Sequence, residues 1–375
     1  MTADSPQTRV SAPARLLSID ALRGFDMFWI IGGAAVVKAL AGWGNWPFKS
    51  EIDDQLEHVP WEGFHFYDLI FPLFLFVIGA VVPYSIAALR QRQEPNSRIY
   101  WRILRRTILL FFLGLVYNNL LRFDFESLRV AGVLQRLAIC YGIAAVIVMN
   151  VGWRGQLFAI ATILLGYWGL LAFAAAPGSS PGDYTKEGNL CGYVDRHYLP
   201  GKIYDEYYGY GDNEGLLSTI PAVATALLGA LAGQWLRSGK TPVRKLAGLI
   251  LAGAICLGTG QIWGEFFPII KNLWTSSYVL VAGGWSLILL AFFYGVIDVV
   301  GWRGWAFFFI VIGSNAIVIY VAPKFIGFKY TADFLFGGLI ARSGSFQPVA
   351  AAIAVLAVKW LILLWLYRKE LFLRV

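Results

Sequence analysis

Long apolar stretches separated by short polar loops recur along the whole chain of 375 residues. A helix needs about 20 apolar residues to cross a hydrocarbon core of about 30 Å. Backbone that faces lipid must satisfy its own hydrogen bonds, and these stretches are too long for barrel strands, so we expect helices. The pattern predicts ten spanning helices, at residues 19–41, 66–89, 103–122, 131–149, 156–176, 215–237, 244–261, 275–298, 304–323 and 349–367.

Composition points to the same class of protein. The chain is 58% hydrophobic and 14% charged, whereas typical soluble domains are about 25% charged. It carries 15 Trp, 18 Tyr and 27 Phe, which fits aromatic belts at both membrane interfaces. Its three cysteines are too few for a disulfide framework or a cysteine-based metal site. We therefore expect a membrane protein rather than a nucleic-acid-binding protein, a disulfide-stapled secreted protein or a disordered chain.

Basic loops predict the orientation, because Lys and Arg near helix ends stay in the cytoplasm. They cluster in residues 90–106 and 237–245, and such loops explain the net charge of +8. The loops at 42–65 and 177–214 are acidic or mixed and are predicted to lie outside. Residues 325–347 are only patchily apolar, and a crossing there would put the basic C-terminus outside. We therefore expect an extracytoplasmic or re-entrant element there, which leaves both termini in the cytoplasm.

The predicted fold class is an all-α polytopic membrane protein with about ten transmembrane helices. One transmembrane domain is expected over residues 15–375, after a short cytoplasmic tail at 1–14 that lacks the pattern of a cleaved signal peptide. No repeat of 20 to 50 residues is evident, which weakly disfavours the inverted-repeat transporter folds.

Ionisable residues inside predicted spans are candidate functional residues, because lipid makes them costly. Asp20, Arg23 and Asp26 follow at spacings of three in the first predicted helix, so neighbouring side chains are within reach. They either form an ion cluster at a helix end, in which the three charges pair with one another, or line the polar wall of a cavity. Asn315 lies near the middle of the predicted helix at 304–323, where it either forms a hydrogen bond to a neighbouring helix or belongs to a functional site.

Three arginines share one face at the cytoplasmic mouth of the third predicted helix. Arg102, Arg105 and Arg106 lie three and four positions apart. Two explanations account for these arginines. They either reflect the positive-inside rule alone or bind the phosphate groups of a ligand through their planar guanidinium groups.

On the predicted outer side, His58 stands in an acidic loop and Asp68 follows ten residues later. Imidazole titrates near neutral pH, so His58 is a candidate general base, although a loop histidine is usually only solvated. Further polar residues stand at the outer ends of other predicted helices: Gln135, Arg136, Glu214 and Asn272. Together they favour a polar cavity, but they do not name a reaction. The chain has no Walker loop, dinucleotide fingerprint or paired-His metal motif.

Seven ordered blocks of sequence carry a resemblance to a known family. They are Leu17–Gly24, His58 with Trp61–Gly63 and Asp68–Pro72, Gly132–Leu137, Gly192–Arg196, Glu214–Ile220, Lys271–Tyr278 and Gly313–Ala316. In these blocks, the chain resembles the heparan-α-glucosaminide N-acetyltransferase family of membrane acetyltransferases and its bacterial relatives. The resemblance extends from about residue 15 to 320.

This resemblance implies transfer of acetyl across a membrane, from cytosolic acetyl-CoA to the amino group of a glucosamine-type sugar on the other side. The family's active-site histidine precedes a Trp-x-Gly and an Asp-Leu-x-Phe-Pro block, and His58 fits that position. A bacterial relative would be a multi-pass protein of the inner membrane. The acceptor stays open among free amino sugar, chitosan-type fragments and a cell-wall glycan. No metal or nucleic acid is expected, and a homodimer is left open.

Within this interpretation, we expect His58 to act as general base or as nucleophile, with Asp68 orienting its imidazole. Donors to the thioester oxygen are expected from Gln135, Asn272 and Asn315. Acetyl-CoA is expected to contact Arg102, Arg105, Arg106, Arg23 and Asn315. The acceptor is expected to contact Asp20, Asp26, Gln135, Arg136, Glu214 and Asn272.

A secondary transporter for amino sugars is the alternative, in which the same buried charges couple uptake. The missing repeat and the outer-loop histidine favour the enzyme, and the density of intramembrane charge disfavours a non-catalytic scaffold.

Overall fold

The computed structural model describes residues 16–44, 46–204 and 209–372. The predicted tail at 1–14 lies outside these residues. Within them, regular structure is helical, and β structure is limited to two isolated bridges, Glu62–Ile270 and Arg129–Gly201. The predicted all-α fold is therefore confirmed.

Eight helical segments in the described part of the chain are long and apolar enough to cross a membrane. The first joins α1 (Leu17–Phe28) and α2 (Ala34–Trp43) through a π-helical turn; the others contain α4 (Ile70–Gln91), α6 (Val133–Asn150), α7 (Trp153–Phe173), α9 (Thr219–Arg237), α10 (Pro242–Gly264), α11 (Ser276–Phe293) and α15 (Gln347–Arg368). A bent pair, α12 (Ala306–Ser314) and α13 (Ala316–Val321), gives a ninth if it forms one span. These segments confirm a polytopic membrane protein.

The remaining helices are shorter or more polar. They are α3 (Lys49–Gln55), α5 (Asn96–Tyr117), α8 (Leu190–Tyr198) and α14 (Phe328–Ala341). Helix α5 corresponds to the span predicted at 103–122 but begins seven residues earlier, and its arginines set it apart from the eight apolar segments. Helix α14 fills most of the predicted element at 325–347 and packs against α15.

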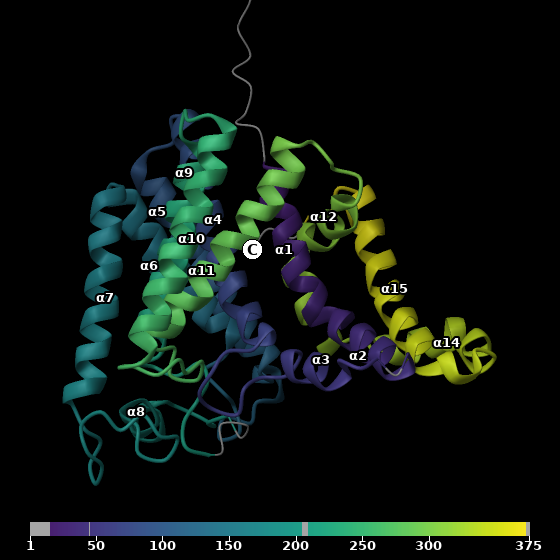
Figure 1. Cartoon of the computed structure of the whole chain (residues 1–375), viewed down its shortest axis with the longest axis horizontal. Helices are drawn as coiled ribbons and strands as arrows, with labels where there is room; N and C mark the ends of the chain where they lie inside the picture. Colours follow the sequence, from purple (N-terminus) through teal and green to yellow (C-terminus); the bar gives the residue numbers. More distant parts are fainter. Residues whose placement is uncertain (1–15, 45, 205–208, 373–375) are drawn as a thin grey trace, which may run out of the picture.

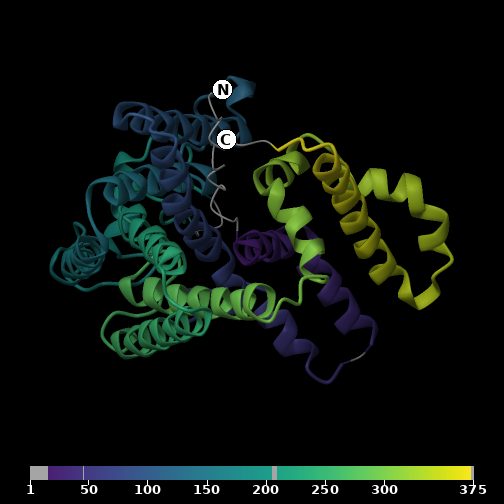
Figure 2. The ribbon, with the colours of Figure 1, turned by 90° about the horizontal axis from the view of Figure 1, so that it is seen from above.

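The helices form a main bundle and a smaller group beside it. Helices α4 to α7 and α9 to α11 gather in the bundle, whereas α12, α14 and α15 lie on the other side of α1 (Figures 1 and 2). Small residues allow close packing inside the bundle, as is common between membrane helices. A Cβ on Gly79 of α4 would overlap the backbone of Ala226 on α9, and one on Gly229 would overlap Phe76.

The helices predicted at 19–41 and 304–323 are each interrupted by a break that the hydrophobic pattern did not indicate. Gly32 adopts φ 148°, a conformation that side chains rarely allow, and the chain changes direction there. Helices α12 and α13 meet at 73°, with Asn315 at the break. A single Gly or Asn within an apolar stretch is compatible with a straight helix, so the pattern alone did not reveal either break.

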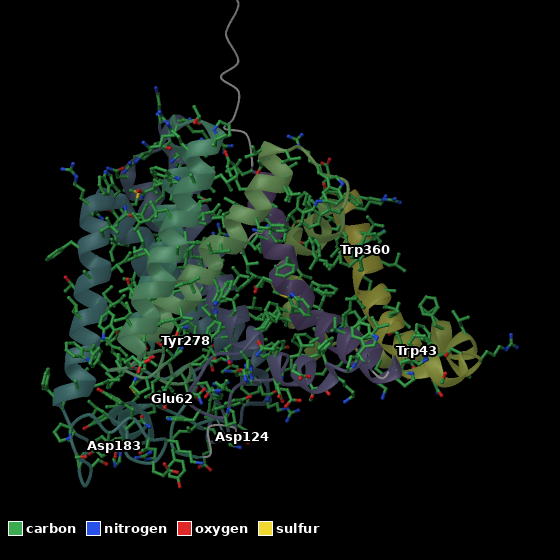
Figure 3. All side chains as sticks on the ribbon, in the orientation of Figure 1. Trp43, Glu62, Asp124, Asp183, Tyr278 and Trp360 are labelled. Carbon is green, nitrogen blue, oxygen red and sulfur yellow. The ribbon has the colours of Figure 1, made fainter. Side chains whose placement is uncertain are left out.

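The two ends of the molecule differ in charge. The connections α4–α5 and α9–α10, which are rich in basic residues, lie at one end, which we call the arginine end (Figure 1). Helices α3 and α8 lie at the opposite end, together with Glu62, Asp124 and Asp183 (Figure 3). We call this the loop end. Helix α1 begins and α15 finishes toward the arginine end. Which end faces the cytoplasm stays a prediction.

Candidate active site

A cavity of about 590 Å³ opens among the segments of the loop end. Its deep wall is apolar and comes from four helices, through Met27 (α1), Phe74 (α4), Leu137 (α6) and Ile317 (α13). Its mouth is polar and includes His58, Arg129, Lys202, Glu214, Lys271 and Lys324. The cavity thus extends from the polar loops toward the interior of the bundle.

His58 and Asp68, predicted as a pair, are in contact at this mouth. The Nδ1 atom of His58 lies 2.8 Å from Oδ1 of Asp68. The carboxylate of Asp68 is fully buried, whereas the imidazole is 50% exposed. A carboxylate accepts, so this contact is a hydrogen bond in the tautomer with the hydrogen on Nδ1, which leaves Nε2 as the basic nitrogen.

Local structure fixes Asp68 in place. It lies in a 3₁₀ turn, Phe66–Leu69, that leads directly into α4. The backbone N–H groups of His65 and Val59 donate to Oδ2 of Asp68, at 3.0 and 3.3 Å. Tyr278 on α11 donates its hydroxyl to the Asp68 carbonyl at 2.8 Å. The two N–H bonds restrict the carboxylate and the Tyr278 bond restricts the backbone of Asp68, so the imidazole that Asp68 holds is oriented before any ligand binds.

Lys271 is the third member of this cluster, and we did not predict it. Its Nζ atom lies 2.7 Å from Nδ1 and 3.0 Å from Nε2 of His58. The same atom is 3.3 Å from Oδ1 of Asp68. Burial lowers the pKa of Lys271, and the charges of Asp68 and Glu214 partly oppose that change. Lys271 begins the block Lys271–Tyr278 and precedes the predicted residue Asn272. That position in the sequence could have identified it as a candidate site residue.

Backbone contacts hold the His58 loop against the turn that carries Lys271. The N–H of Gly63 donates to the carbonyl of Ile269 at 2.9 Å. Glu62 and Ile270 form an isolated antiparallel bridge. Because the two segments are joined on their main chains, the backbones that carry His58 and Lys271 are held close to each other.

A second charged cluster lines the other side of the mouth. Arg129 donates to both carboxylate oxygens of Asp212, at 2.9 and 2.6 Å, and to Glu214 at 2.5 Å. Burial alone would lower the pKa of Arg129, but its bonds to these two carboxylates raise it. The guanidinium also lies 4.2 Å from the ring centre of Tyr204. Glu214, a predicted substrate-binding residue, is therefore held at the cavity edge.

Comparisons with known proteins relate this chain to a family model and to curated relatives. A family model described as a domain of unknown function (DUF5009) matches residues 15–149, which include His58 and Asp68. The human heparan-alpha-glucosaminide N-acetyltransferase is 28% identical over 423 residues, covering 97% of this chain and 60% of that protein. The mouse protein of the same name is 28% identical over 427 residues, covering 98% of this chain and 61% of its own length. The chain is a distant relative of these acetyltransferases. It spans about three fifths of the length of either heparan-alpha-glucosaminide N-acetyltransferase.

Asp20 and Asp26, the two acidic residues predicted as substrate-binding on α1, have surroundings that differ from each other. Arg23 donates through Nη2 to Asp20 at 2.9 Å and through Nε to the carbonyl of Gly313 at 2.6 Å. This pair therefore joins α1 to α12. Asp26 is fully buried, and its carboxylate oxygens have no hydrogen-bond partner among the described residues. Its neighbour Met27 lines the His58 cavity.

The predicted phosphate-binding arginines lie on α5 at the arginine end, away from the His58 cavity. Arg102 donates to Glu94 at 3.0 Å, and Glu94 also accepts from Arg98. Arg105 is exposed. The guanidinium of Arg106 lies 4.5 Å from the ring centre of Tyr141.

Four of the remaining predicted residues are not part of the cavity wall that the described residues form. Gln135 and Arg136 are buried in the first turn of α6 and line a second hollow, together with Glu214. Asn315 donates to the carbonyl of Leu371 at 3.1 Å. Asn272 is half-buried beside Lys271 and is likewise not part of the cavity wall.

No group of three or more His, Cys, Asp or Glu that could hold a metal ion occurs among the residues that the structure describes.

Proposed function

We propose that this chain is a transmembrane acetyltransferase that moves acetyl from acetyl-CoA to the amino group of a glucosamine-type sugar. The observation that carries the proposal is the oriented His58–Asp68 pair at the mouth of a cavity of about 590 Å³. Small-molecule sites in proteins span about 300–1,000 Å³. The names of the two relatives support acetyl transfer to an amino sugar. The site of action would be the inner membrane of a bacterium, with the loop end outside.

In the direct route, His58 is the general base. The amine nitrogen attacks the thioester carbonyl, and Nε2 takes the proton that the nitrogen loses. When the carbon–sulfur bond breaks, the thiolate of CoA leaves and receives that proton. Asp68 keeps the imidazole in the correct tautomer and stabilises the imidazolium, as the carboxylate does in a Ser-His-Asp triad.

In a two-step route, Nε2 itself attacks the thioester and carries the acetyl group to the amine. The geometry is compatible with both routes. Incubation with acetyl-CoA alone separates them, because only the two-step route releases free CoA and leaves acetyl on the protein.

Lys271 has a defined part in either route. Its ammonium group lies beside the imidazole, where the thioester oxygen gains negative charge during attack, and a buried cation stabilises that charge. Because Nζ is 3.0 Å from Nε2, the lysine must shift when the acceptor amine approaches that nitrogen. Lys202 and Lys324 also line the mouth. Positive neighbours disfavour a protonated amine, so they favour the neutral amine that attacks.

Acetyl-CoA would approach from the arginine end. Arg102, Arg105 and Arg106, with Arg23, would bind its phosphate groups there. The pantetheine arm would then extend through the bundle toward His58. The apolar deep wall of the cavity, at Met27, Phe74 and Leu137, supports this path because it continues from His58 into the bundle.

The test uses purified protein in detergent with labelled acetyl-CoA and glucosamine. Label on the sugar supports the enzyme. The rival proposal is an amino-sugar transporter, for which sugar would enter liposomes in the absence of acetyl-CoA. Flux without acetyl transfer would reject the acetyltransferase.

A further inference from the structure

A groove runs along the outside of the bundle over α6, with α5 on one side and residues of α7 and α9 on the other. It consists of two adjoining hollows of about 550 and 600 Å³, which share Ile139 and Ile143. We call it the α5–α6 groove and define it by Phe111, Leu104 and Trp101 on α5 and by Arg136, Ile139, Ile143 and Val146 on α6. From Arg136 to Val146 it extends roughly 15 Å at 1.5 Å per residue, about half of the hydrocarbon core of a bilayer.

The groove faces lipid. Ile139, Ile143 and Val146 are 36%, 44% and 42% exposed, although all three are apolar. They recur at spacings of four and three, so they lie on one face of α6. On a membrane helix such a face contacts hydrocarbon, and a groove in it fits a hydrocarbon chain from the bilayer.

Unpartnered donors lie at the loop end of this groove. Arg136 is only 1% exposed, donates through Nη2 to Ser218, and lies 4.8 Å from the ring centre of Trp274. Its Nε and Nη1 atoms, and Nε2 of Gln135, have no hydrogen-bond partner among the described residues. Buried donors without acceptors are costly. A guanidinium fork and the N-terminal end of a helix both favour a phosphate group.

The groove and the His58 cavity adjoin. Glu214 lines both of them. Its carboxylate accepts hydrogen bonds from the hydroxyl and amino groups that a sugar offers. A ligand with its chain in the groove and its phosphate at Arg136 would therefore place its next group beside Glu214, at the edge of the cavity that contains His58.

We infer that the acceptor is a lipid-linked amino sugar, in which a phosphate joins a long hydrocarbon chain to the sugar. The chain occupies the α5–α6 groove, the phosphate binds Arg136 and Gln135, and the sugar passes Glu214 to reach His58. This inference rests on the proposed acetyl transfer and specifies its acceptor.

The test compares two acceptors in the same detergent with labelled acetyl-CoA. One is free glucosamine, and the other is glucosamine joined through a phosphodiester to a polyprenol. The wild-type kcat/KM should be at least tenfold higher for the lipid-linked sugar. Ile143→Trp fills the groove and should lower the ratio of the two kcat/KM values at least tenfold. Ile255→Trp, at a lipid-facing position of α10 that is 58% exposed, is the matched control and should leave the ratio unchanged.

A binding measurement by native mass spectrometry makes the test independent of turnover. The lipid-linked sugar should bind wild-type protein at least tenfold more tightly than phosphatidylglycerol, and Arg136→Gln should remove that difference. Equal affinity for phosphatidylglycerol would identify a structural lipid site and overturn the inference. Equal kcat/KM for the two acceptors would overturn it as well, while the proposed function would stand. Failure to acetylate either acceptor would reject the proposed function, and the acceptor assignment with it.

Discussion

The loop end and the arginine end both carry ionisable side chains, but they hold them differently. At the loop end, His58 contacts Lys271 across 213 residues of sequence, and Arg129 contacts Asp212 across 83. At the arginine end, Glu94 pairs with Arg98 and Arg102, four and eight residues away. Long-range contacts around the buried carboxylates of Asp68 and Asp212 fix a geometry in advance, which chemistry requires. Local pairs on an exposed helix leave the side chains free to rearrange around a flexible ligand.

This difference supports the proposed arrangement, in which the acetyl group is transferred at the loop end and acetyl-CoA is bound at the arginine end. The arrangement requires the two ends to lie on opposite sides of the membrane.

The first prediction tests that requirement and has an all-or-none outcome. In protein with Cys256→Ala, a cysteine at Ser180 should react with an impermeant thiol reagent on intact spheroplasts, and one at Ser97 only after the membrane is broken. Both serines are exposed. Cys140 and Cys191 are buried and need no replacement, and burial raises the pKa of the Cys191 thiol to about 12.

The measurement is gel shift or mass change of the labelled protein. Reactivity in the opposite order would put His58 on the cytoplasmic side and would exclude transfer across the membrane.

The second prediction concerns the chemistry at the loop end. His58→Ala should lower the turnover of acetyl transfer by a factor of roughly 10² to 10⁴, the usual contribution of a positioned base. Acetyl-CoA affinity and expression should change little, because the imidazole is half exposed. His197→Ala, an exposed histidine on α8, is the matched control. Turnover within threefold of wild type would remove His58 from the reaction.

The third prediction concerns Lys271. Lys271→Met should lower kcat roughly 100-fold, as loss of one donor to a developing oxyanion does. Burial lowers the pKa of Lys271, so in wild-type protein the rate should fall at alkaline pH as the ammonium loses its proton. That fall should be absent from the variant. A pH–rate profile of kcat measures both effects, and an alkaline limb that persists in Lys271→Met would contradict this assignment.

How far the site was predictable depends on sequence separation. His58 and Asp68 lie ten residues apart in one of the blocks that carry the family resemblance, and the pairing was predicted within that interpretation. Lys271 reaches them only because the Gly63–Ile269 bond and the Glu62–Ile270 bridge join two distant loops. No periodicity in the chain encodes that contact.

The fold was more predictable than the site, because hydrophobic length determines which segments cross a membrane. The limits appear where one residue changes the path of the chain, as Gly32 does through its φ of 148°. Cys191 shows the same limit on the loop side. A polar loop predicts an accessible thiol, but α8 buries this residue against Tyr167, 3.1 Å from its hydroxyl.

The fourth prediction concerns the arginine end. Single replacement of Arg105 or Arg106 by Gln should weaken acetyl-CoA binding by about 1 to 3 kcal/mol, the range of a charge-assisted contact. Arg102→Gln should have a smaller effect because Glu94 already binds that guanidinium. Arg98→Gln, which affects the same Glu94, is the control. Calorimetric titration measures the affinity for acetyl-CoA. An unchanged affinity in all three variants, at Arg102, Arg105 and Arg106, would mean that these arginines reflect only the positive-inside rule.

The last prediction compares a buried acid at the loop end with an acid at the arginine end that pairs with exposed arginines. Burial raises the pKa of Asp195 to about 6, although backbone N–H groups of Leu216 and Asp212 donate to it. A pKa raised above its unfolded value of about 3.9 means that stability is fully present below that value and is lost as pH rises to about 6. The rise of about two pKa units limits this loss to about 3 kcal/mol.

Asp195→Asn removes this titration, so wild type should exceed the variant in Tm by more at pH 4.5 than at pH 7.5, by a few degrees. Glu94→Gln is the matched control. The pKa of Glu94 is lowered by its bond to Arg98, but its partners Arg98 and Arg102 are exposed to solvent, which screens the interaction, so no comparable change with pH is expected. Thermal unfolding in detergent followed by tryptophan fluorescence measures the difference. A Tm difference between wild type and Asp195→Asn that stays constant from pH 4.5 to 7.5 would show that titration of the buried Asp195 carboxyl does not change the stability of the protein.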